Sequence, residues 1–434
     1  MITFTLFAVF FVLVFLGAPI ALCLGIASLV VLEYLPGTPT VTLLIKSAVT
    51  AADSFPLVAI PLFVLAGDIM QRGGLSARIV RSAYTLVGGF KAGLAYVNVL
   101  ASMFFAAISG SSPATVAAIG SIMVPEMEKA GYKRPFSAAL TAASGIIGVM
   151  IPPSIPFIIY GVAANQSIGK LFLAGVIPGV LFGLGFMALS RLTISSNMIE
   201  GSRLDEFRKE GEALAAHGHG LRDNAIWALI VPIIILGGIY GGVFTPTEAA
   251  GAAVIYALMV SLYVYRNLNW KDLWAILLRS SVTSVVCLVM VVMASSFGRL
   301  LTLQRVPVDI ANFIISISHN PVVVLILINI MLLIAGMFME TIALIIILTP
   351  ILLPIVTQAG MDPLHFGVIM TVNLAIGFCT PPLGANLFIA TGVAEIRLED
   401  LIRKIVPFII AMIVMLMLVT FIPQLSLWLH SMMD

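Results

Sequence analysis

Hydrophobic residues occur along the chain in long runs that are separated by Gly, Pro or charged positions. Many runs approach the roughly 20 residues that an α-helix needs to cross a bilayer, and they lack the alternation of membrane β-strands. The pattern predicts an all-α polytopic membrane protein, with one polar stretch between Ser195 and Asn224 as a linker. The apolar runs lie at 2–16, 18–34, 54–71, 92–108, 112–128, 135–164, 171–190, 225–241, 246–265, 280–302, 321–338, 341–358, 364–393 and 405–429.

The composition supports a membrane protein. Of the 434 residues, 61% are hydrophobic and 10% charged, whereas soluble proteins are about half apolar and a quarter charged. The mean hydropathy of +1.14 excludes a cytosolic enzyme, a nucleic-acid binder and a secreted domain. The run that begins at Ile2 has no basic n-region and no cleavage site, so we expect a retained span. Cys23, Cys287 and Cys379 lie in apolar runs, and we expect no disulfide and no cysteine metal site.

The two halves of the chain share a set of Pro and Gly positions at a constant spacing of 229 (354−125 and 381−152, for example). This spacing predicts a first repeat at 1–195, a linker at 196–224 and a second repeat at 225–434. We expect a hairpin at 92–128 and a broken helix at 135–164 in the first repeat, then a hairpin at 321–358 and a broken helix at 364–393 in the second. The matching positions are Pro125 with Pro354, Ala130-Gly131 with Ala359-Gly360, Pro152-Pro153 with Pro381-Pro382, and Pro178 with Pro407.

The distribution of Lys and Arg predicts the orientation of the chain, because cytoplasmic loops carry an excess of them. We consider five crossings and one re-entrant hairpin per repeat, with the linker 196–224 cytoplasmic and both termini periplasmic. In this arrangement, all of the 22 Lys and Arg residues lie on the cytoplasmic side of the membrane except Lys46, Lys170, Arg299 and Arg305. Since five is odd, the repeats have opposite orientations, which is the inverted-repeat design of many secondary transporters. We expect the four outer cations to dock a soluble partner.

Helix-breaking sequence occurs at four places in these apolar regions, which we name by their expected structure. The first tip is Ser109–Pro113, the second tip Gly336–Thr341, the first break Gly148–Ser154 and the second break Gly377–Gly384. A double proline removes amide donors and leaves carbonyls free, which is tolerated at membrane depth only inside protein or beside a wet cavity. Carbonyl and hydroxyl oxygens with few charges suit a dehydrated alkali cation. The alternative is that each double proline is only a kink.

Glu340 is a further candidate, since an acid within an apolar run is costly and indicates function. We expect it to balance the charge of a cation; the alternatives are a carboxylate that caps the helix beginning at Thr341 and one that reaches water. Asn98, Asn329 and Asn373 are explained by interhelical hydrogen bonds, although Asn373 remains a candidate for substrate contact. No phosphate-binding loop is present, so we expect no ATP site and no organic cofactor. The stretches 40–52, 76–90 and 268–279 mix apolar and basic residues and predict interfacial helices.

Several motifs resemble the large membrane subunit of tripartite ATP-independent periplasmic (TRAP) transporters. The resemblance covers nearly the whole chain. It implies an elevator-type transporter in the bacterial inner membrane, driven by a sodium gradient. It also implies two partners, a small four-helix membrane subunit and a soluble periplasmic protein that delivers an organic acid. The motifs are Ala107–Gly120 at the first tip, Asp53–Leu57 followed by Ile60–Phe63, Ile151–Ile155, Phe244–Glu248 and Thr380–Pro382.

The resemblance also implies two sodium sites, partly through backbone carbonyls. The family often has Asp where this chain has Glu340, and the first tip is more similar to members for C4-dicarboxylates or sugar acids than to those for sialic acid. Polar residues beside the implied ligands are candidates for substrate contact. The first sodium site has Ser109, Ser111, Gly148, Ile151 and Pro153; the second has Glu340, Thr380 and Leu383; the substrate candidates are Ser112, Ser154, Thr341, Asn373 and Asn386.

Two other classes of protein remain as alternatives. A stand-alone sodium/dicarboxylate cotransporter of related architecture would need no delivery protein. A membrane-embedded enzyme is disfavoured, because the sequence has no constellation of acid, base and nucleophile. The sequence therefore favours a transporter that is not an enzyme and leaves the identity of the organic acid open.

Overall fold

The computed structural model describes residues 2–32, 40–90, 92–194, 226–310 and 320–431, so the predicted linker 196–224 lies outside the described residues. Every regular element of the described part is helical, which confirms the predicted all-α class. Within these described ranges, seven helical segments are long and apolar enough to cross a membrane, which supports a multi-pass protein. They are Phe55–Arg72, Ile168–Thr193, Pro246–Val264, Trp270–Leu303, Pro321–Phe338, Thr341–Gln358 and Leu398–Phe421.

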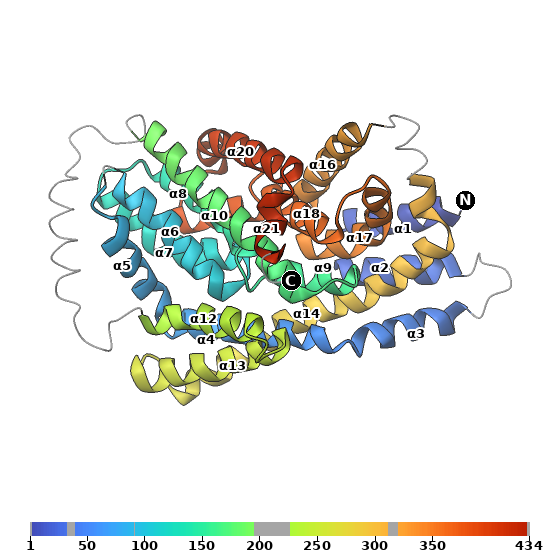
Figure 1. The fold of residues 1–434 in the computed structure, drawn as a ribbon, viewed down its shortest axis with the longest axis horizontal. Helices are drawn as coiled ribbons and strands as arrows, with labels where there is room; N and C mark the ends of the chain where they lie inside the picture. Colours follow the sequence, from blue (N-terminus) through green and yellow to red (C-terminus); the bar gives the residue numbers. More distant parts are fainter. Residues whose placement is uncertain (1, 33–39, 91, 195–225, 311–319, 432–434) are drawn as a thin grey trace.

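A long helix, α14 (Trp270–Leu303), runs along one side of the molecule beside α3 (Thr40–Ala52) (Figure 1). It also packs against α2 (Ile20–Leu32), which follows α1 (Ile2–Phe15). The prediction of a separate interfacial helix at 268–279 was wrong, because α14 continues through this stretch without interruption. No Pro and no Gly before Gly298 breaks it, and Asn269 and Asp272 form a capping box at its start.

A second group of helices packs beside α14, mainly through α4. The short 3₁₀ helix η1 (Phe55–Val58) leads into α4 (Ala59–Arg72) and α5 (Leu75–Val87). Helix α4 packs against α13 (Pro246–Met259), which follows α12 (Ile226–Tyr240) and ends in a π-helical turn at Val260–Val264. Thr245 and Glu248 cap α13 reciprocally, which gives part of the Phe244–Glu248 motif a structural role.

The remaining helices form two series of similar order, and their helices are interrupted at all four predicted places. Helix α7 (Ser112–Lys129) and helix α17 (Thr341–Gln358) are related at both ends by the spacing of 229 (341−112, 358−129). The opposite orientation of the series remains a prediction. The first series has α6 (Gly93–Ser109), α7, α8 (Arg134–Gly145), η2 (Ile146–Val149), α9 (Ile155–Ala163) and α10 (Ile168–Thr193). The second has α16 (Pro321–Phe338), α17, α18 (Pro363–Gly377), α19 (Ala385–Ala394) and α20 (Leu398–Phe421), followed by α21 (Gln424–Ser431).

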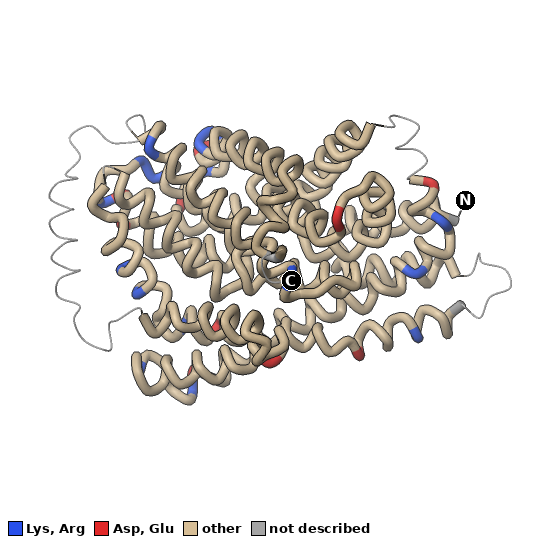
Figure 2. The backbone as a smooth tube through the Cα atoms, viewed as in Figure 1, with Lys and Arg blue, Asp and Glu red and all other residues tan. Residues whose placement is uncertain are grey.

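Most of the described Lys and Arg residues lie toward the two ends of the long axis, whereas several Asp and Glu residues lie nearer its middle (Figure 2). Cationic ends are expected of a helical membrane protein, because Lys and Arg concentrate in the loops between its spans.

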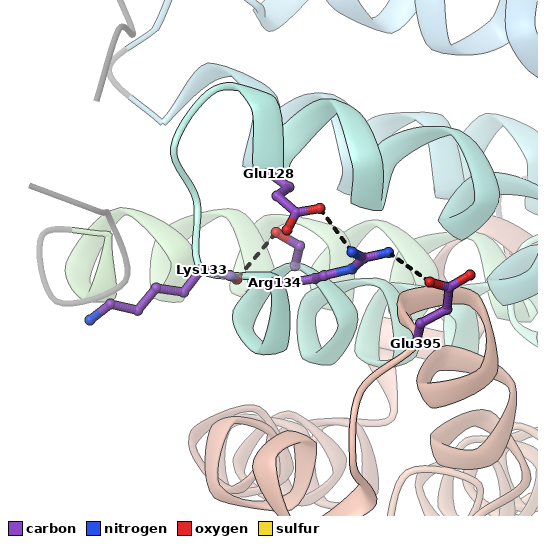
Figure 3. Close-up of polar contacts among 5 residues, drawn as sticks. Glu128, Lys133, Arg134 and Glu395 are labelled. Carbon is purple, nitrogen blue, oxygen red and sulfur yellow. Dashed lines mark hydrogen bonds and ion pairs between the residues drawn. The ribbon is translucent and has the colours of Figure 1, made fainter. Parts of the chain in front are cut away.

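One ionic cluster joins the two series at an end of the molecule. Arg134, at the start of α8, lies between Glu128 of α7 and Glu395, which follows α19 (Figure 3). Its guanidinium nitrogens are 3.2 Å from the Glu128 carboxylate and 3.8 Å from the Glu395 carboxylate. Beside it, the Ser137 hydroxyl donates to the carbonyl of Lys133. The cluster therefore connects α7, α8 and α19 through side chains of opposite charge.

Candidate functional site

The first tip lies directly against the first break. Helix α6 ends at Ser109, and Gly110 turns the chain with a left-handed φ of +60°. A Cβ on Gly110 would stand only 2.6 Å from the carbonyl oxygen of Pro153, so only glycine permits this approach. The amide of Ile155 donates a hydrogen bond to the Gly110 carbonyl (3.4 Å). Backbone contact therefore fixes the tip to the break.

Oxygen atoms gather where these two segments meet. The Thr115 hydroxyl donates to the carbonyl oxygen of Ser111 (2.8 Å) and lies 3.0 Å from the Ser109 hydroxyl. Gly148 approaches so closely that a Cβ there would be 2.7 Å from the Ser111 oxygen and 2.6 Å from Thr115 Oγ1. The structure thus brings together Ser109, Ser111, Gly148 and Pro153, four of the five residues implied for the first sodium site.

Thr115 also belongs to this group of oxygens, although it is not among the residues implied for the first sodium site. It lies four positions after Ser111, hence one turn along α7 on the same face, and this spacing is the signal that could have found it. Ile151, by contrast, turns its side chain toward Gly179 of α10. Its contribution to a cation site would have to come from its backbone carbonyl.

The second tip is more open. Helix α16 ends at Phe338 and α17 begins at Thr341, with Glu340 at the N-cap position. The Glu340 carboxylate makes no capping hydrogen bond to the helix, and its side chain is exposed. The capping alternative is therefore right about the position of Glu340 and wrong about the hydrogen bond.

A cavity of about 380 Å³ lies between the second tip, the second break and the start of α19. Glu340 and Leu383, both implied for the second sodium site, line this cavity, and Pro113 lines it from the first tip. The third residue, Thr380, is absent from the lining, and its hydroxyl donates to the Ile376 carbonyl one turn earlier (2.9 Å). The structure therefore brings two of the three residues to the cavity, while Thr380 lies within the second break and outside the cavity lining.

Asn386 is the substrate candidate with the most contacts between the two series. Its side-chain amide donates to the Ser112 hydroxyl of the first tip (2.8 Å) and to the Ala142 carbonyl of α8 (3.1 Å). The side chain is buried, and its Oδ1 atom has no hydrogen-bond partner within the described residues. A buried acceptor without a partner requires an explanation, and a bound ligand or cation is one.

The other substrate candidates have different surroundings. The Ser154 hydroxyl donates to the Val149 carbonyl (2.6 Å) and accepts from the Phe157 amide, so it caps α9. Asn373 donates to the side-chain oxygen of Asn329 (2.7 Å), which confirms the expected interhelical hydrogen bond. Thr341 is buried beside the second tip, and its hydroxyl has no partner in the described part of the chain.

The donor set at the tips fits an alkali cation. At the first tip the donors are uncharged hydroxyl and carbonyl oxygens, and at the second a carboxylate is added. Within the described ranges, no three His, Cys, Asp or Glu residues group together as ligands for a transition metal. The three cysteines are buried and free. The chemistry available at the tips is therefore ion coordination and hydrogen bonding.

Comparison with known proteins places this geometry in a family. The family described as "Tripartite ATP-independent periplasmic transporter, DctM component" matches residues 7–425. The chain is 45% identical over 423 residues to the isethionate TRAP transporter permease protein DctMQ of Oleidesulfovibrio alaskensis, covering 98% of this chain and 65% of that protein's length. It is 41% identical over 376 residues to the C4-dicarboxylate TRAP transporter large permease protein DctM of Pseudomonas aeruginosa, covering 87% of this chain and 86% of that one.

Among solved structures, the YdaH transporter of Alcanivorax borkumensis shares the fold with a TM-score of 0.59 and 16% identity, covering 87% of this chain and 86% of that one. This likeness shows a membrane-transporter fold and says nothing about substrate. The match over most of the chain settles the family: the chain belongs to the DctM component family, the large permeases of tripartite ATP-independent periplasmic transporters.

Proposed function

We propose that this permease imports a small organic acid across the bacterial inner membrane and that a sodium gradient drives the import. Two partners act with it, a small four-helix membrane subunit and a periplasmic protein that delivers the acid. The substrate and at least two sodium ions cross together by an elevator movement of the two tips and the two breaks. The observation that most supports this proposal is the group of oxygen atoms from Ser109, Ser111 and Thr115 that lies against Gly148.

The relatives support the class of substrate. One is named for isethionate, a sulfonate, and another for C4-dicarboxylates. Both substrates are small organic anions. We therefore propose a C4-dicarboxylate, a sugar acid or a sulfonate of similar size for this chain, in preference to the larger sialic acid.

The second candidate is a stand-alone cotransporter, and reconstitution distinguishes the two. The chain and its small subunit are placed in liposomes, with the delivery protein outside, and uptake of labelled substrate is followed. We expect uptake only with an inward sodium gradient and only with the delivery protein. Uptake by the chain without its partners would favour the stand-alone cotransporter, and equal uptake in potassium would contradict sodium coupling.

A matched pair of threonine variants tests the first tip itself. Thr115→Val removes the hydroxyl that contacts Ser109 and Ser111, so the sodium concentration for half-maximal uptake should rise about tenfold, equivalent to ~1.4 kcal/mol. Thr349→Val is the control, because the Thr349 hydroxyl is also buried in the series but contacts only the sulfur of Met370 (3.7 Å). An equal shift in both variants would show that the effect is not specific to the tip.

A further inference from the structure

A second cavity, of about 620 Å³, lies away from the tips. One wall is formed by α3 and α14, and the other by the last turn of α9 and the middle of α17. Helix α17 starts at the second tip, and α9 starts at the first break. The cavity therefore lies between the α3–α14 pair and the two helices that lead away from the proposed ion sites, and beside it α14 packs directly against α17.

The charged residues that line this cavity are Lys46 and Arg299, and no Asp or Glu lines it. Neither cation forms an ion pair with another residue in the described part of the chain. Both side chains are exposed, so they lie at the open side of the cavity. The remaining polar lining consists of hydroxyl groups, from Ser47, Thr50, Ser54, Ser295 and Thr302.

The cationic wall is held in place by hydrogen bonds between its two helices. The Ser295 hydroxyl donates to the Ser47 carbonyl (3.2 Å), and the Ser296 hydroxyl donates to the Leu44 carbonyl (3.0 Å). These bonds fix the register of α3 against α14, so Lys46 and Arg299 open onto one cavity. A site built on two joined helices keeps its charges in position better than one built on loops.

We propose that this cavity binds a small organic anion with a carboxylate or sulfonate group. Arg299 presents a planar guanidinium that can hold such a group with two hydrogen bonds, and Lys46 adds a second positive charge. The hydroxyl groups serve the remaining oxygens of the anion. The volume lies within the range of ligand pockets, roughly 300–1,000 Å³. The inference rests on the proposed transport of an organic acid. It assigns recognition of the negative charge of that acid to residues outside the tips.

The cavity changes the role expected for two of the four outer cations. The distribution of Lys and Arg along the sequence predicts an outer surface with Lys46, Lys170, Arg299 and Arg305 that docks the delivery protein. The structure places Lys46 and Arg299 in one cavity with hydroxyl groups, whereas Lys170 and Arg305 are absent from its lining. Arg305 follows the end of α14, is exposed, and provides the matched control.

The test measures anion binding to the full chain purified with its small subunit. Calorimetry with succinate, isethionate and gluconate is performed on the wild type and on the Arg299→Gln, Lys46→Gln and Arg305→Gln variants. We expect wild type to bind at least one of the three and Arg299→Gln to weaken that binding at least tenfold, with a smaller loss for Lys46→Gln. Arg305→Gln should bind as wild type does. Since these side chains are exposed, the variants should fold, which size-exclusion profiles check.

Three results with the soluble anions would overturn the inference: no binding of any of the three anions by wild type, unchanged binding in both cavity variants, or equal loss in Arg305→Gln. An anionic lipid headgroup shares the same chemistry, so binding is repeated in nanodiscs with and without phosphatidylglycerol. Lipid binding that depends on Arg299, without binding of the soluble anions, would assign the cavity to lipid and also overturn it. Binding is measured without a sodium gradient, so it does not depend on sodium coupling. If the proposed sodium coupling were wrong, wild type would still bind the anion but would show no sodium-dependent uptake.

Discussion

The two tips occupy equivalent places in their series and differ in almost every contact. The first is fixed through Gly110 against Pro153, with the amide of Ile155 bonded to it. The second exposes Phe338 and Glu340 and borders a cavity. Helices α6 and α7 run side by side, whereas α16 diverges from α17 (Figure 1). The first tip is therefore packed against its break, and the second tip is exposed.

The difference follows from residue choice at the turn. Ser and Gly at the first tip are small enough for backbone to meet backbone. The Ser109 hydroxyl lies 3.0 Å from the Thr115 hydroxyl, and the Ser112 hydroxyl accepts from Asn386. Met339 and Glu340 at the second tip have long side chains, one of them charged, so the turn cannot pack as closely. We infer that substitutions in the first tip disturb both folding and transport, whereas those in the second disturb ion binding alone.

Gly110→Ala should have the largest effect, because the new Cβ collides with the Pro153 carbonyl and the residue must keep a left-handed φ. Sodium-dependent uptake should fall below about a hundredth of wild type, a loss of more than ~2.7 kcal/mol. Gly360→Ala is the control: φ is +84° there, but nothing lies within 4 Å of a Cβ. That variant should lose only about 1–2 kcal/mol of stability and keep transporting. Equal losses of uptake in the two variants would mean that backbone strain, and not the contact with the first break, causes the loss.

Glu340→Gln comes next and concerns the exposed tip. Because the carboxylate caps no helix, its loss should leave the amount and melting temperature of the protein nearly unchanged. Sodium half-saturation should rise about tenfold, since a cation loses one charged ligand, worth ~1.4 kcal/mol. Glu399→Gln, at an exposed acid in the first turn of α20, controls for loss of charge. A melting temperature that falls with unchanged sodium dependence would assign Glu340 a structural role.

The fold was largely predictable from sequence, because Gly, Pro and Ser residues within the apolar runs mark the positions where the helices are interrupted. The predicted first tip, between runs 92–108 and 112–128, agrees within one residue with the end of α6 and the start of α7. The continuity of α14 was not predicted, because the basic residues of 268–279 suggested an interfacial segment. Periodicity alone does not show whether two adjoining amphipathic and apolar stretches join into one helix.

The candidate site was predictable in part. Residues close in sequence to a Gly or Pro signal, such as Ser109 and Glu340, could be found. Contacts between distant segments could not, because no local pattern indicates that Asn386 meets Ser112 or that Lys46 and Arg299 share a cavity. Thr380 is implied as a sodium ligand only by the resemblance; its hydroxyl donates to the Ile376 carbonyl, and its role as a ligand stays a prediction.

Asn386→Ala tests the contact between the two regions with an intermediate effect. It removes donors to the Ser112 hydroxyl and the Ala142 carbonyl, which should cost about 1–3 kcal/mol of stability and reduce uptake several-fold. Asn373→Ala is the matched control: this buried Asn pairs with Asn329 within the second series. Both variants should melt earlier, but only Asn386→Ala should alter sodium half-saturation. A sodium shift of the same size in both would show that general loosening explains the effect.

The smallest effect is expected from the ionic cluster that also joins the two regions. Arg134 is 31% exposed and Glu395 81% exposed, and such pairs contribute about 0–1 kcal/mol because water screens them. A double-mutant cycle of Arg134→Gln and Glu395→Gln, read from unfolding in denaturant, should give a coupling energy below ~1 kcal/mol, with uptake unchanged in Glu395→Gln. Glu128→Gln should couple to Arg134 more strongly, since its distance is 3.2 Å and not 3.8 Å. If the Glu395 pair instead coupled by more than ~2 kcal/mol, the two regions would be held together at this end by charge, and the buried contact of Asn386 would no longer be the main link between them.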